Sequence, residues 1–179
     1  MRLAILGGFF MTNNFYKTSM AANQANSTLA VTILRDALIP ELTGEATGIL
    51  YWVGKRLARQ FALAKDEDLP LFFEQTNWGT LKRIKGKANQ QVFTLTGEMV
   101  ATRLKLNDQA DFKLECGFLA ETVQNQSGFM AEALVDSVNS KKGIVTIIVQ
   151  VDTKDPLDFE LYEQPETLEL VTPKKEATE

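Results

Sequence analysis

The chain has 179 residues, a formal net charge of −4 and no histidine. This length supports one domain with a core that needs no disulfide, and the single cysteine, Cys116, cannot form an internal bridge, so the composition fits a reducing cytoplasm. The acidic balance disfavours binding to nucleic acid, and the lack of histidine excludes the usual general base, the commonest metal ligand and a histidine-ligated haem.

A short apolar run at the start, MRLAILGGFF, resembles part of a targeting signal. Polar residues such as Asn13 and Lys17 interrupt the region that follows, and a run of about ten residues is too short to span a bilayer. We therefore expect neither a cleaved signal peptide nor stable membrane insertion. The start of translation is open between Met1 and Met11. Residues 1–26 lack a sustained hydrophobic period and are predicted to be a flexible segment.

Three helices are predicted next. The first begins at Ser27 or Thr28 and should end or bend at Pro40, because proline lacks the amide donor that a helix interior needs. A short third helix lies within DEDLPLFFEQTNW, where Pro70 falls in the tolerant first turn. Its apolar face is expected at Leu69, Phe72 and Phe73.

The second helix is predicted within TGILYWVGKRLARQFAL, with Thr47 as its cap. Helical spacing assigns an apolar face to this segment and directs its basic residues elsewhere. The residues expected on the apolar face are Ile49, Leu50, Val53, Leu57 and Phe61, and the basic residues are Lys55, Arg56 and Arg59. Gly54 is expected to permit close packing against another helix.

The pattern then changes to alternating apolar and polar residues in TLKRIKGKANQQVFTLTGEMVATRLKL. We interpret this stretch as three antiparallel strands joined by turns at KGKANQ and TGE. Asn107 and Asp108 end the sheet segment and can start the next helix.

The stretch from Phe112 to Asp152 is the most informative about the fold. FKLECGFLAETVQNQS predicts an amphipathic helix that stops at Gly128. FMAEALVDSV and GIVTIIVQVD, joined by NSKKG, predict a hairpin with a half-exposed first strand and a more buried second strand. The folded domain is therefore predicted at 27–152, and residues 153–179 are predicted to be an acidic arm with a disordered tail.

Several of these motifs carry a family resemblance. ILRDALIPEL, ILYWVGKRLAR, FFEQTNWGTL, RLKLND and FKLECGFLAETVQ occur in this order, ahead of AEA, a lysine-rich turn and a valine-rich strand. From about Ser27 to Asp152 the chain resembles the YslB family, small Firmicute proteins that carry a domain of unknown function. That family is similar, more distantly, to vinyl-reductase-type ligand-binding domains and to the small subunits of the TRAPP vesicle-tethering complex.

The resemblance implies an α+β fold, in which N-terminal helices pack on an antiparallel sheet and a later helix leads into a C-terminal β-hairpin. It also implies a homodimer and an apolar cavity, which in some members holds an acyl chain, a hydrocarbon or haem. The chain departs from the metal-binding branch, because it has no histidine and no cysteine pair. We therefore expect no metal and no cofactor.

Five residues are candidates for contact with an apolar ligand. Tyr51 and Trp52 could form an aromatic wall of a ligand site. Lys55 and Arg59, four residues apart, could bind an anionic head group. Cys116 and Phe118 lie on the apolar stripe of the later helix, where the thiol could face a pocket.

Each candidate also has a structural interpretation. The aromatic residues are expected in a core beside a solvated basic face, and Cys116 is expected to be a small buried hydrophobe, since Glu115 is adjacent and no histidine exists to lower the thiol pKa. Arg35, Asp36, Arg103 and Glu115 are expected to form structural ion pairs. A catalytic pair of Asp36 with Glu115 has no motif to support it.

The sequence therefore predicts a cytoplasmic, non-enzymatic domain that binds a small apolar or acyl-like ligand. The alternative is a homodimeric scaffold or protein-interaction module without a ligand. Neither the ligand nor the partner can be identified from the sequence.

Overall fold

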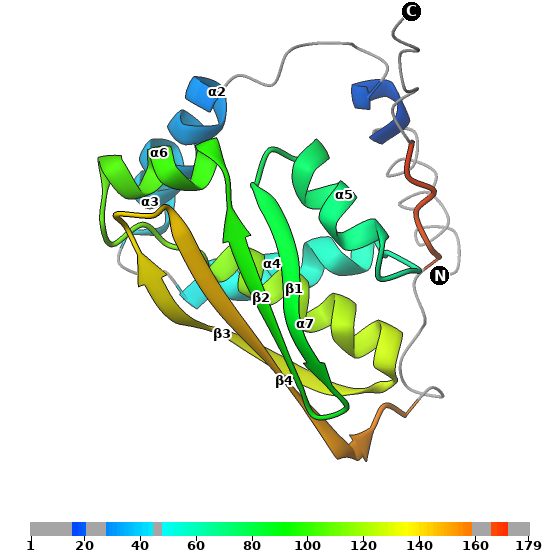
Figure 1. Cartoon of the computed structure of the whole chain (residues 1–179). Helices are drawn as coiled ribbons and strands as arrows, with labels where there is room; N and C mark the ends of the chain where they lie inside the picture. The colour runs from blue at the N-terminus through cyan, green and yellow to red at the C-terminus, as the bar shows by residue number, and fades with distance from the viewer. Residues whose placement is uncertain (1–15, 21–27, 45–47, 159–165, 172–179) are drawn as a thin grey trace, which may run out of the picture.

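The computed structural model describes residues 16–20, 28–44, 48–158 and 166–171. Within these residues, four antiparallel strands form one sheet, and Figure 1 shows α4 and α7 behind it. The α+β fold and the closing hairpin predicted from the sequence are confirmed. The strands occur in the order β1-β2-β4-β3 and span Thr80–Lys87 (β1), Gln90–Thr96 (β2), Phe129–Asn139 (β3) and Ile144–Pro156 (β4).

The sheet buries one face against the helices. Phe93 lies opposite Ile147, and Leu95 lies opposite Val145, so that the inward side chains of neighbouring strands are in register. These four residues are buried. The two strands at the sheet edges, β1 and β3, are less buried than β4, which agrees with the predicted half-exposed first strand of the hairpin.

The first helix is continuous through three segments, α2 (Thr28–Thr32), η1 (Ile33–Leu38) and α3 (Ile39–Thr43). η1 is π-helical and directly precedes α3, which has Pro40 in its first turn. The helix is therefore distorted before the proline, as predicted, but it continues past Pro40 and ends at Gly44, where φ is 56°. We call this unit the first helix below.

α7 (Lys113–Ser127) is the central helix of the fold. It contacts β3 and β4 on one side and α4 (Gly48–Gln60) on the other. It is consequently buried from Leu114 to Gln124. As predicted, it stops at Gly128, which adopts a left-handed conformation with φ 75°. The predicted start at Asn107 is early, because Asn107 is extended.

The predicted third strand of the meander is wrong. Residues Glu98–Leu106 form helix α6, which begins directly after Gly97, whose φ of 109° ends β2. Met99, Val100 and Leu104 are buried together in a helical rather than an alternating pattern. The segment is short, and the spacing of its apolar residues fits either a strand or a helix. The turn at Gly97 decides for the helix, and the sequence pattern did not reveal this turn.

The predicted apolar face of α4 is wrong at its start and holds at its end. Ile49 is 48% exposed and Val53 is also exposed, whereas Leu57 and Phe61 are partly buried against the core. The most buried residues of α4 are Gly54, Lys55 and Ala58, on the side that packs against α7. α5 (Asp68–Gln75), in contrast, buries Leu69, Phe72 and Phe73 as predicted, with Pro70 in its first turn.

Two glycines explain this orientation of α4. A methyl group on Gly54 would clash with the carbonyl oxygen of Leu114 and would lie 2.9 Å from the amide nitrogen of Phe118. A methyl group on Gly117 would clash with the carbonyl oxygen of Tyr51. The backbones of α4 and α7 are therefore in direct contact, and the close packing predicted for Gly54 is confirmed.

Parts of both predicted terminal segments pack on α5. Residues 16–20 are helical and bury Tyr16, whose hydroxyl donates to Gln75 Oε1 at 2.6 Å and accepts from the amide of Val171 at 3.1 Å. The amide of Leu168 donates to the carbonyl of Ala62 at 2.7 Å. The remaining residues of these two segments lie outside the described residues. Among the helices that are described, none is long and apolar enough to cross a membrane.

Replacing Gly117 by alanine should destabilise the fold by about 3 kcal/mol or more, because the new methyl group meets backbone that cannot rotate away. The free energy of unfolding, measured in urea, tests this. Gly48→Ala on α4 is the matched control, since a methyl group at Gly48 would have no atom within 4 Å, and it should leave stability unchanged or slightly raised. Equal stability of the two variants would contradict the glycine contact.

Candidate functional site

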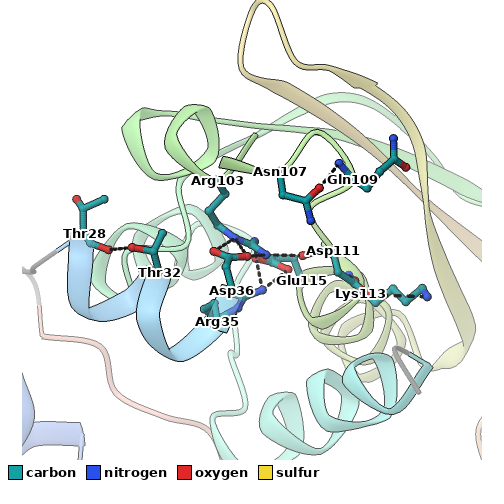
Figure 2. Close-up of polar contacts among 10 residues, drawn as sticks. All are labelled: Thr28, Thr32, Arg35, Asp36, Arg103, Asn107, Gln109, Asp111, Lys113 and Glu115. Atoms are coloured by element: carbon teal, nitrogen blue, oxygen red, sulfur yellow. Dashed lines mark hydrogen bonds and ion pairs between the residues drawn. The ribbon is translucent and has the colours of Figure 1, made fainter. Parts of the chain in front are cut away.

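A buried cluster of charges joins the first helix to α6 and α7. Arg35 Nη2 lies 2.9 Å from Glu115 Oε1, and Arg103 Nη2 lies 2.9 Å from Asp36 Oδ1. Arg103 Nη1 is 3.5 Å from the same Glu115 oxygen, so the four residues form one network. Figure 2 shows their charged groups pointing toward one another. The predicted structural ion pairs are confirmed.

The arginines of this cluster are committed to protein groups. Arg103 also donates to the carbonyl of Asp111 at 2.7 Å and lies 4.6 Å from the ring centroid of Phe112. Burial disfavours the charged form of Arg35, but the carboxylate of Glu115 outweighs this effect and raises the pKa of Arg35. Arg35 therefore stays charged. Both guanidinium groups are paired with protein carboxylates, so the cluster stabilises the attachment of the first helix and is a poor site for an anion.

An open hollow of about 550 Å³ lies beside the cluster, between the first helix and α6. Its floor is polar and includes Asp36 and Arg103, whereas Leu29, Ile33 and Leu106 form part of its rim. The hydrogen-bonding capacity of the floor is largely used within the protein, so the hollow does not present a free charged group.

A second charged network occupies the other side of α7. Lys55 Nζ lies 2.8 Å from Glu132 Oε1 and 4.0 Å from Glu121 Oε2, and Arg59 Nε lies 2.5 Å from Glu121 Oε1. The hydroxyl of Tyr51 also bonds to Glu132. Burial and this carboxylate together raise the pKa of Tyr51 above its ordinary value. Lys55 is therefore held by carboxylates, and not exposed on a solvated face as its helical position suggested.

Three of the five candidate residues line one open groove. Tyr51 and Trp52 from α4 and Cys116 from α7 face β3 around a space of about 590 Å³, which we call the edge groove. Lys55 does not line the groove, but its Nζ lies 5.8 Å from the ring centroids of both aromatic residues. Phe118 is not in the groove: it is fully buried and stacks on Phe72, with ring centroids 4.8 Å apart.

The thiol of Cys116 sits at the buried base of this groove with 1% of its surface exposed. Burial raises the pKa of Cys116, and the nearby negative charges of Glu115 and Asp111 raise it further. The thiol is therefore protonated at neutral pH. These properties fit the structural interpretation of Cys116 as a small buried hydrophobe.

A separate hollow of about 260 Å³ lies between α4, α5 and residues 16–20, and sequence reasoning did not find it. We call it the aromatic hollow. Its walls come from segments far apart in the chain, so only the aromatic density of LFFEQTNW signals it in the sequence. The lining residues are Tyr16, Ser19, Met20, Leu57, Phe61, Phe72, Gln75, Thr76 and Trp78.

Aromatic packing holds the floor of the aromatic hollow in place. Phe72 stacks on Phe118, and Trp78 packs edge-on against both Phe72 and Phe118, with centroids 5.9 and 5.3 Å apart. Phe61 packs against Phe72 at 5.8 Å. The described residues contain no cluster of three side chains suited to bind a metal ion. The chemistry available in this hollow is thus apolar contact.

Comparison with known proteins supports the resemblance seen in the sequence. A family model described as a protein of unknown function (DUF2507) matches residues 28–150. The uncharacterized protein YslB of Bacillus subtilis (strain 168) is 36% identical over 129 residues, which cover 72% of this chain and 86% of that protein.

Two solved structures share this fold at low sequence identity, and a third has a lower structural similarity. A vinyl-4-reductase family protein from Methanocaldococcus jannaschii has a TM-score of 0.59 at 12% identity, over 85% of this chain and 98% of that one. The phenol-responsive sensory domain of the transcription activator PoxR, with phenol, has a TM-score of 0.53 at 15% identity, over 76% and 77%. A trafficking protein particle complex subunit 3 from Naegleria fowleri, covalently bound to palmitic acid, reaches only 0.40 at 12% identity, over 82% and 96%.

Replacing Glu115 by glutamine should cost about 3 kcal/mol of stability, because it keeps the side-chain volume but leaves two buried arginines with one carboxylate fewer. Urea unfolding measures the loss. Asp66→Asn is the control: it breaks the more exposed pair with Arg83, 2.8 Å apart, and should cost at most about 1 kcal/mol. A Glu115 variant as stable as the Asp66 variant would show that the cluster does not fasten the fold.

Proposed function

We propose that the chain, which belongs to the YslB family of proteins of unknown function, binds a small apolar molecule in the aromatic hollow. The observation that carries this proposal is the lining of the hollow, where Leu57, Phe61, Phe72 and Trp78 provide apolar walls. Ligand sites in proteins are typically concave, mostly apolar and largely formed in advance, as this one is.

The volume of the hollow limits the size of the ligand. At about 260 Å³ it lies just below the usual range for ligand sites, which begins at about 300 Å³. A single aromatic ring or a short alkyl chain fits this space. We therefore narrow the expected apolar or acyl-like ligand to a molecule of that size.

The polar groups at the rim favour a ligand without charge. The hydroxyl of Tyr16 and the amide of Gln75 are bonded to each other and to the backbone of Val171, with Gln75 Nε2 2.6 Å from its carbonyl oxygen. A charged group brought into the hollow would lose its hydration without gaining a counter-ion among the lining residues. The phenol held by the PoxR sensory domain is a ligand of this neutral, aromatic kind on a similar fold.

We further propose that binding is not followed by catalysis and that the protein acts in the cytoplasm. The charged side chains near α7 are held in ion pairs, and the protonated, buried thiol of Cys116 is a weak nucleophile. These features support a binding domain over an enzyme.

Phenol or octanol at about 100 times its dissociation constant should raise the melting temperature by roughly 5 to 10 °C, since binding to the native state alone adds about 2.7 kcal/mol. Differential scanning fluorimetry and calorimetric titration measure this. Leu57→Trp, which fills the hollow, should abolish the shift.

Trp52→Ala is the control for the ligand experiment, because Trp52 lines the edge groove and not the aromatic hollow. It should leave the shift intact. Loss of the shift in Trp52→Ala, with retention in Leu57→Trp, would place the ligand in the edge groove. The absence of a shift with either probe, together with no small molecule in extracts of the purified protein, would contradict ligand binding.

A homodimer is the second candidate, and it is compatible with a ligand. The observation that favours it is the exposure of large aliphatic side chains on the first helix, where Leu29 is 68% and Leu42 is 75% exposed. Sedimentation equilibrium at tens of micromolar should give twice the 20.0 kDa mass of one chain. A monomer at that concentration would contradict the homodimer.

A further inference from the structure

The first helix is inverted relative to an ordinary surface helix. Its charged residues Arg35 and Asp36 face the protein, where they meet Glu115 and Arg103. Its large aliphatic residues face outward, with exposed fractions between 45% and 75%. We call these residues the aliphatic stripe; they are Leu29, Ile33, Leu34, Leu38 and Leu42.

Ion pairs take the place of apolar packing in holding this helix. Besides its bond to Glu115, Arg35 lies 5.9 Å from the ring centroid of Trp78. Thr32 is the one buried residue that the helix contributes. The usual arrangement for a surface helix buries the apolar side and exposes the charged side. The opposite arrangement indicates that the stripe is made to be covered by something else.

We infer that the aliphatic stripe is the interface with a second copy of this chain, packed antiparallel across a two-fold axis. The inference rests on the proposed homodimer and assigns its surface. Leu106 on α6, which is 67% exposed and shares a hollow with Leu29 and Ile33, extends the same apolar surface.

The composition of the stripe favours a permanent partner. It consists of leucine and isoleucine without aromatic or arginine residues, and so resembles a protein core more than a transient recognition surface. An apolar stripe that stayed exposed to solvent would promote aggregation. In a two-fold dimer the same stripe of a second copy covers it, and no further copies can add to that interface.

The position of the single charge on the outer side selects the antiparallel arrangement. Glu41 is exposed near the C-terminal end of the helix. In a parallel pair, the two Glu41 carboxylates would face each other. In an antiparallel pair, each carboxylate lies near the N-terminal end of the other helix, where the helix dipole favours negative charge. That register places Leu29 opposite Leu42 and Ile33 opposite Leu38.

Leu34→Glu should convert the full-length dimer to a monomer, measured by sedimentation velocity from one to 100 µM, because it buries two charges near the axis. The matched control is Leu134→Glu on β3, whose parent side chain is 59% exposed outside the stripe, and this variant should stay dimeric. Circular dichroism of both variants shows that a change in mass does not come from unfolding.

Two outcomes would overturn the interface, and they differ in what they say about the dimer. A wild-type monomer removes the dimer altogether. A wild-type dimer that persists in Leu34→Glu, or that dissociates in Leu134→Glu alone, keeps the dimer and moves it to another surface. Neither outcome decides whether a ligand binds, which the thermal shift with phenol or octanol tests separately.

Cysteine cross-linking tests the antiparallel arrangement. Ala37 lies near the expected axis, so Ala37→Cys should form a disulfide between two copies under mild oxidation. Ala30→Cys should not, because its two copies would lie about 16 Å apart along the helix, beyond the reach of a disulfide. Cys116 is buried and adds little background. Cross-linking of Ala30→Cys as efficient as that of Ala37→Cys would overturn the antiparallel arrangement.

Discussion

The contact between α4 and α7 at Gly54 and Gly117 is the constraint on which the rest of the structure depends. The two backbones touch there, so neither position has room for a side chain, and the contact holds the Gly54 side of α4 against α7. That orientation carries Tyr51 to the edge of β3, where its hydroxyl accepts from the amide of Ala133 at 3.1 Å. It also turns Leu57 toward the aromatic hollow. Both candidate binding surfaces along α4 thus follow from a steric requirement of two glycines.

Buried carboxylates on α7 are the second determinant of the architecture. Glu115 and Glu121 belong to two separate charged networks around α7. Both side chains are fully buried, so each carboxylate requires a cationic partner. Glu115 obtains one from the first helix, and this fixes which side of that helix faces the protein. The aliphatic stripe is exposed as a consequence, since one helix cannot direct both Arg35 and its leucines toward α7.

The sequence predicted the parts of the fold that depend on local signals, such as the hairpin from its turn and the end of α7 from Gly128. It failed where a longer-range contact decides. Hydrophobic periodicity put Lys55 on a solvated face, because the pattern contains no information about Glu121 and Glu132. It likewise could not join Tyr16 to Trp78 in one hollow. Three of the candidate ligand residues do meet in the edge groove, while Phe118 lies in the aromatic core.

One residue connects the aromatic hollow with the first helix. Trp78 lines the hollow and also lies beneath the guanidinium of Arg35, which bonds to Glu115. A ligand that shifts the indole would therefore change the position of the first helix, which carries the aliphatic stripe. Thermodynamic linkage then requires reciprocity: if the ligand strengthens the dimer by a given factor, dimerisation strengthens ligand binding by the same factor. An affinity for phenol that is equal in the wild-type dimer and in a Leu34→Glu monomer would mean that the two surfaces work independently.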